Sequence, residues 1–88
     1  MQIVKRNGKI VDFDASKIKT AIQKANREVD EKGQATDAEI EQILAYILGL
    51  KKKRLLVEDI QDIIEERLMM FGHYDLAKCY IVYRYNHQ

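Results

Sequence analysis

Apolar positions recur with helical spacing over most of the chain and alternate like a strand only near its start. Spacings of three and four residues predict four helices, at about 16–27, 37–49, 57–71 and 73–85. Thr36-Asp37-Ala38-Glu39 matches a capping box before the second of these. The pattern therefore predicts a helical bundle that follows a short β-rich beginning.

The β-rich beginning contains the strongest turn signal of the chain, the Asn-Gly pair at 7–8. We expect a two-residue hairpin loop, in which Val4 lies opposite Val11 on the face toward the helices. In that register Lys5 lies opposite Ile10 and points to the other face. The predicted fold is α+β, with an N-terminal β-hairpin packed on a four-helix bundle in one domain over residues 1–88.

Composition narrows the class of protein. The chain has 88 residues, 47% of them hydrophobic and 33% charged, and no apolar run reaches the roughly 20 residues that span a bilayer. We expect a cytoplasmic protein with no membrane contact, since the N-terminus lacks a signal-peptide pattern. A single cysteine excludes an internal disulfide. Fifteen basic against fourteen acidic residues make nucleic acid an improbable partner.

A local cluster of cations nevertheless suggests a site for an anion. Lys17 falls in the first turn of a predicted helix, where the macrodipole is positive and acidic residues are the usual choice. Lys5 and Arg6 flank the hairpin turn, and Arg84 lies on the last helix. With the free amides at 15–18, these groups could converge on a polyphosphate. The alternative, in which the hairpin cations only keep an edge strand soluble, stays open.

Catalytic signals are missing from the pattern. There is no P-loop and no Gly-x-Gly-x-x-Gly run. His73 and His87 are isolated near helix ends and are predicted to be solvated, and the pair Glu65-Glu66 is interpreted as part of a solvated helix face. We expect no enzymatic activity from this chain.

The motifs, in their order and with their gaps, resemble the ATP-cone, a regulatory nucleotide-binding module of ribonucleotide reductases. The matching runs are Val-Lys-Arg-Asn-Gly at 4–8, Phe-Asp at 13–14, Lys-Ile at 17–18, Val-Glu-Asp-Ile-Gln-Asp-Ile-Ile-Glu at 57–65 and Ala-Lys-Cys-Tyr-Ile-Val-Tyr-Arg at 77–84. Val57 stands where many relatives have Thr, and Asn7 where Asp is commoner.

The resemblance implies a hairpin lid over four helices that binds ATP or dATP without hydrolysis. It implies allosteric control of a reductase through subunit association, with the enzyme's catalytic domain or subunits as partners and self-association as a further possibility. The tail at 80–85 looks most like the anaerobic class, whose enzymes reduce ribonucleoside triphosphates. The implied nucleotide-binding residues are Val4, Lys5, Arg6, Val11, Asp14, Ser16, Lys17, Val57, Gln61 and Arg84. The number of nucleotides and the participation of Mg²⁺ stay open.

Two other classes of function compete with this interpretation. A small nucleic-acid-binding or transcription-regulator domain could use the same cations together with the basic run at 51–54. The family's own transcriptional regulator carries a cysteine-rich zinc ribbon, which one cysteine cannot supply. A ligand-free interaction module could instead dock through the apolar residues at 69–71 and Tyr74.

Overall fold

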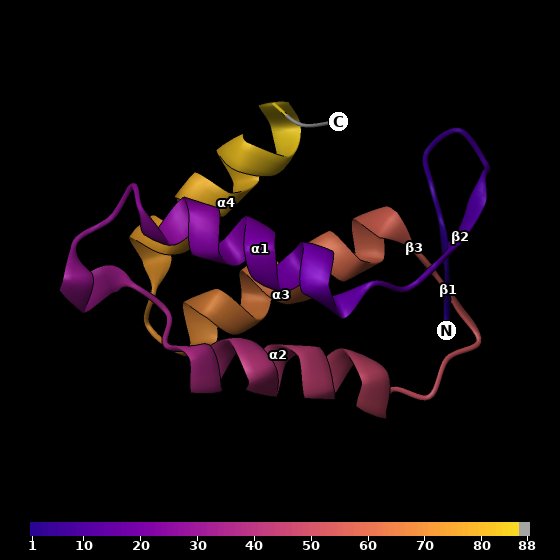
Figure 1. Ribbon diagram of the computed structural model, residues 1–88, viewed down its shortest axis with the longest axis horizontal. Coiled ribbons are helices and arrows are strands. Elements are labelled where there is room, and N and C mark those ends of the chain that lie inside the picture. The colour runs from indigo at the N-terminus through magenta and orange to yellow at the C-terminus, as the bar shows by residue number, and fades with distance from the viewer. Residues whose placement is uncertain (87–88) are drawn as a thin grey trace.

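A computed structural model describes residues 1–86 as a small sheet at one end of a helical bundle (Figure 1). This arrangement confirms the predicted α+β class, and His87 lies outside the described residues. The elements in chain order are β1 (Gln2–Val4), β2 (Ile10–Asp12), α1 (Ala15–Asn26), the 3₁₀ turn η1 (Glu31–Gly33), α2 (Asp37–Gly49), β3 (Arg54–Leu56), α3 (Val57–Met70) and α4 (Tyr74–Asn86).

Capping side chains mark the starts of two helices, and a glycine marks the end of a third. The predicted capping box is present at α2, where the Thr36 side chain accepts from the Glu39 N–H and the Glu39 side chain accepts from the Thr36 N–H. Asp14 caps α1 by accepting from the N–H of Ser16. At the end of α3, Gly72 adopts a positive φ of 84° that turns the chain into α4.

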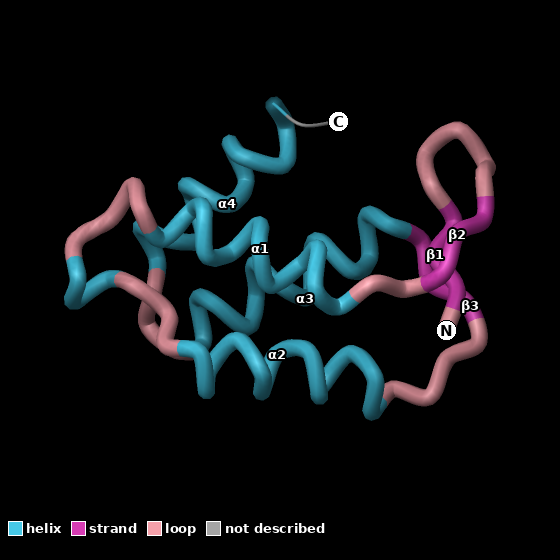
Figure 2. Tube along the Cα trace, in the orientation of Figure 1, coloured by secondary structure: helices cyan, strands magenta, loops and turns pink. Residues whose placement is uncertain are grey.

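The sheet has a third strand that the sequence pattern did not predict. Residues 54–56 were expected to connect two helices, yet they form β3, which pairs in parallel with β1 (Figure 2). The strand order is β2-β1-β3. Because β3 runs directly into α3, the sheet fixes the position at which α3 begins, next to the hairpin.

The hairpin register differs by one residue from the predicted one. Val4 pairs with Ile10 and Ile3 with Val11, and the N–H of Lys5 donates to the carbonyl of Lys9. The loop is therefore three residues long, with a left-handed residue at its end. Lys5 shares a face with Ile3 whatever the register, because side chains alternate along a strand. Ile3, and not Val4 or Val11, packs against the core. The expectation that Lys5 points away from the bundle was therefore wrong, because it assigned the opposite face of the strand to the core.

The core lies between the four helices and reaches the inner face of the sheet. Ile22, Ile40, Ile47, Ile64 and Leu76 are among its fully buried side chains. The sheet contributes Ile3 and Leu55, which are register partners and pack against this cluster from one face. Within residues 1–86, no helix has the length and apolar character that crossing a membrane requires.

Candidate functional site

A cavity of about 540 Å³ lies between the hairpin and the helices α1, α3 and α4. Among the ten site residues predicted from the sequence, six line this cavity: Lys5, Arg6, Lys17, Val57, Gln61 and Arg84. Sequence reasoning had not assigned its other lining residues to the site; these are Asn7, Ile18, Ala21, Tyr80 and Tyr83. The elements that meet here are far apart in the sequence, so the cavity is a product of the tertiary fold.

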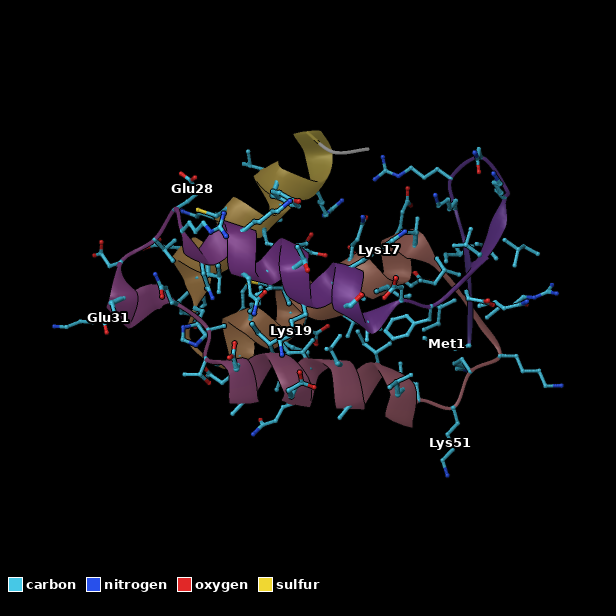
Figure 3. The ribbon with its side chains drawn as sticks, in the orientation of Figure 1. Met1, Lys17, Lys19, Glu28, Glu31 and Lys51 are labelled. Atoms are coloured by element: carbon cyan, nitrogen blue, oxygen red, sulfur yellow. The ribbon has the colours of Figure 1, made fainter. Side chains whose placement is uncertain are left out.

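The cavity has cations at the end formed by the hairpin and the start of α1. Lys5 faces the cavity because it lies two residues after Ile3, whose side chain packs against the core, and Arg6 follows it in the loop. Lys17 stands near the start of α1, a helix with no acidic residue in its first turn (Figure 3). The helix dipole adds positive potential at the same place. Together these groups form a region suited to a multiply charged anion.

Arg6 also has an acidic partner. Its Nε lies 3.1 Å from Oε1 of Glu58, in the first turn of α3, and both side chains are substantially exposed. An exposed pair of this kind stabilises a protein by only about 0–1 kcal/mol. An anionic ligand in the cavity could therefore draw Arg6 away from Glu58 at little cost.

Arg84 is held more firmly, by two residues of α3. Its Nε donates to Oε1 of Glu65 at 2.6 Å, and its Nη1 donates to Oε1 of Gln61 at 3.1 Å. The side chains of Arg84 and Glu65 are only 21% and 14% exposed. The interpretation of Glu65 as part of a solvated helix face was therefore wrong, because its carboxylate is largely covered and tied to α4.

Two tyrosines of α4 complete the wall. Burial, with the nearby carboxylate of Glu65, raises the pKa of Tyr80 to about 12, although the charge of Arg84 acts in the opposite direction. The Tyr80 phenol is thus neutral at physiological pH and can donate a hydrogen bond. The ring of Tyr83 lies 6.0 Å from Nζ of Lys24. Aromatic surface beside a polar network is suited to a ligand with a flat ring.

The other four predicted site residues do not line the cavity but support it. Asp14 accepts hydrogen bonds from the Ser16 N–H and hydroxyl, at 3.0 and 2.6 Å. The Ser16 hydroxyl bond is the main reason that the pKa of Asp14 is lowered. These contacts fix the start of α1, which carries Lys17. Val4 and Val11 lie in the strands that carry the hairpin loop.

Two other sequence features are located outside the cavity. The basic run continues into β3, where Arg54 Nε donates to Gln2 Oε1 at 3.0 Å, and Figure 3 shows Lys51 well away from Lys17. His73 was predicted to be solvated, yet its side chain is only 12% exposed and its Nε2 lies 2.9 Å from Oε1 of Glu39. That prediction was wrong. Within residues 1–86, no group of His, Cys, Asp and Glu is arranged to hold a metal ion.

Comparison with known proteins gives a consistent result. The family model described as the ATP cone domain matches residues 1–88. A ribonucleoside-diphosphate reductase subunit alpha of Chlamydia trachomatis serovar D is 36% identical over 95 residues, which cover 96% of this chain and 9% of the relative. A vitamin B12-dependent ribonucleoside-diphosphate reductase of Thermoplasma acidophilum is 39% identical over 90 residues, covering 94% of this chain and 11% of the relative. The corresponding Mycobacterium tuberculosis protein is 36% identical over 83 residues, which cover 94% of this chain and 12% of that relative. The chain therefore spans about a tenth of the length of these relatives.

Proposed function

The chain belongs to the ATP-cone family, and we propose on that premise that it binds ATP or dATP in the cavity between the hairpin and the helices. The phosphates contact Lys5, Arg6 and Lys17, and the base and sugar extend toward Gln61 and α4. The nucleotide acts as an effector and is not hydrolysed. Its binding controls the activity of the ribonucleotide reductase that carries the domain.

The observation that carries this proposal is the convergence of cations on one cavity in a nearly neutral protein. The formal net charge is only +1, yet Lys5, Arg6, Lys17 and Arg84 all line the same space. A volume of about 540 Å³ falls within the range of roughly 300–1,000 Å³ that is usual for small-molecule sites. A nucleic-acid-binding surface would be expected to expose its cations more widely, so that alternative is not favoured.

Regulation requires that ATP and dATP favour different states, although they differ by one ribose hydroxyl. A ligand with equal affinity for both states shifts nothing. Allosteric coupling energies are typically about 1–3 kcal/mol, which one or two hydrogen bonds can supply. Met69, Met70 and Tyr74 are 42%, 66% and 63% exposed at the junction of α3 and α4. We propose that this surface alters subunit association when the effector changes.

The class of the reductase is a separate proposal. The residues at 80–85 favour the anaerobic class, in which the substrates are ribonucleoside triphosphates. The relatives described above are diphosphate reductases by name, so this proposal rests on the residues at 80–85 alone.

Isothermal titration calorimetry with ATP, dATP and GTP, each with Mg²⁺ and with EDTA, tests the proposed site. Removing a charge-assisted hydrogen bond costs about 1.5–3 kcal/mol, so Lys5→Ala and Lys17→Ala should each weaken ATP binding about tenfold or more. Lys9→Ala and Lys52→Ala remove the same charge outside the cavity lining and should bind nearly as the parent does. Unchanged ATP affinity in both cavity variants would contradict the proposal. Light scattering and a phosphate-release assay on the same samples report self-association and hydrolysis.

A further inference from the structure

Glu65 is a largely covered carboxylate that does not itself line the cavity. It lies behind Arg84, accepts from the guanidinium Nε at 2.6 Å, and is only 14% exposed. A charged side chain is seldom covered to this extent unless a partner compensates it, and here the partner comes from another helix. The contact joins α3 to α4 at the cavity wall.

The contact with Arg84 also determines which way the amide of Gln61 is turned. A guanidinium has only donors, so the atom of Gln61 that faces Arg84 Nη1 must be the carbonyl oxygen. The reversed amide would bring two donors together. The NH₂ group of Gln61 is consequently the end that remains for a ligand in the cavity, where it can donate to an acceptor atom.

The same ion pair affects how charge is distributed along the cavity. Glu65 compensates the charge of Arg84 within a largely covered pair, whereas Lys5 and Lys17 remain at the hairpin end. The positive potential is therefore concentrated where the phosphates are proposed to bind. The end near Gln61 is left polar but close to neutral, as suits a base or a sugar.

We propose that Glu65 is a positioning residue for the nucleoside: it holds Arg84, which turns the NH₂ group of Gln61 toward an acceptor atom of the base or sugar. This inference rests on the proposed function, since it concerns the orientation of a nucleotide in the same cavity. Without Glu65, Arg84 is free to act as an additional cation for phosphate. Recognition then shifts from the nucleoside to the polyphosphate.

The test compares ATP with inorganic tripolyphosphate, which has the phosphates but no nucleoside. Glu65→Gln removes the negative charge of the acceptor while the guanidinium donor stays charged, so Arg84 is held more weakly, and the ratio of ATP to tripolyphosphate affinity should fall about fivefold. Glu66→Gln makes the same charge change one residue away on the exposed side of α3 and should leave the ratio unchanged. Glu65→Asp keeps the charge but withdraws it from Arg84, so the ratio should also fall.

A purely structural defect would weaken the binding of ATP and of tripolyphosphate alike. The role of Glu65 would therefore be overturned if both affinities changed equally in Glu65→Gln, or if its affinity ratio matched that of Glu66→Gln. A double-mutant cycle gives an independent readout. Gln61→Ala should reduce ATP affinity in the parent but have little further effect in Glu65→Gln, whereas additive losses would show that Glu65 does not act through Gln61. If the parent chain binds neither ligand, the proposed function itself fails, and that result differs from each of these.

Discussion

Glu39 accepts hydrogen bonds from two parts of the chain that are distant in the sequence. Its Oε1 lies 2.9 Å from the Thr36 N–H nitrogen and 2.9 Å from Nε2 of His73, so it joins the start of α2 to the connection between α3 and α4. Partial burial alone would raise the pKa of Glu39. The hydrogen bonds from Thr36 and His73 outweigh burial and hold the pKa below its ordinary value of 4.5.

This lowered pKa predicts a pH-dependent contribution to stability. A carboxyl group whose pKa is depressed by folding stabilises the folded state above its unfolded pKa, here 4.5, and loses that effect as pH falls through the folded value. Glu39→Gln should therefore lower the free energy of unfolding at pH 7 by about 1 kcal/mol, and the deficit should disappear under more acidic conditions. Urea unfolding of the parent and the variant at a series of pH values measures this difference in the free energy of unfolding. A deficit that persists at pH 2, or an equal one in Glu66→Gln, would contradict the assignment.

For a single residue, the sequence shows the local structural propensity but not the residue that it contacts in the folded protein. Lys17 was identifiable because a lysine in the first turn of a helix is locally unfavourable, and that conflict is visible in the sequence. Glu65 and His73 carry no such conflict. Each looks like an ordinary surface residue, and each is covered by a partner 19 or 34 positions away. Only the tertiary fold could show that they are structural.

Among the elements, the hairpin has the most direct control over the site, because it carries two of the cations, Lys5 just before its loop and Arg6 in the loop. Gly8 has a φ of 82°, a conformation that costs a residue with a side chain about 1–2 kcal/mol. Gly8→Ala should lower the free energy of unfolding by about that amount and weaken ATP binding, since Lys5 and Arg6 shift with the loop. Thermal unfolding and calorimetry measure the two effects.

Gly49 provides the matched control for this substitution. It ends α2 without a positive φ, and an added Cβ would meet nothing within 4 Å. Because alanine favours helix over glycine by about 1 kcal/mol, Gly49→Ala should be neutral or stabilising and should leave ATP affinity unchanged. Equal losses of stability in the two variants would mean that the left-handed turn at Gly8 is not the cause.

The errors in element prediction have physical reasons. An Asn-Gly pair suits both a two-residue loop, which needs positive φ at both positions, and a three-residue loop, which needs it only at the glycine. Asn7 is not among the described residues with positive φ, so the longer loop forms and the register moves by one. β3 is three residues long and exists because β1 lies beside it, about fifty positions away in the sequence. The helices, by contrast, were predictable because their apolar periodicity persists over several turns.

At the scale of the whole molecule, the cavity is formed by the hairpin loop and by all the α-helices of the described residues 1–86 except α2. Its lining comes from the hairpin loop, the first half of α1, the start of α3 and the second half of α4. These segments lie around the same side of the bundle, and α2 runs along the opposite side (Figure 1). A ligand in the cavity would therefore contact segments from both ends and the middle of the chain and hold them in one arrangement.

This arrangement predicts a specific pattern of amide hydrogen exchange. Amides that exchange by local opening should slow on ATP binding at 5–8, 15–21, 57–61 and 80–84 together, because the ligand holds these segments in one arrangement. Amides at 38–48 in α2 that exchange by local opening should change little in exchange rate. Amides that exchange only by global unfolding should slow throughout the chain, because the bound ligand raises the free energy of unfolding. Lys17→Ala at the same ATP concentration should show a much smaller effect at all four segments. Slowing confined to the hairpin would mean that the nucleotide binds at its surface and does not reach α3 and α4.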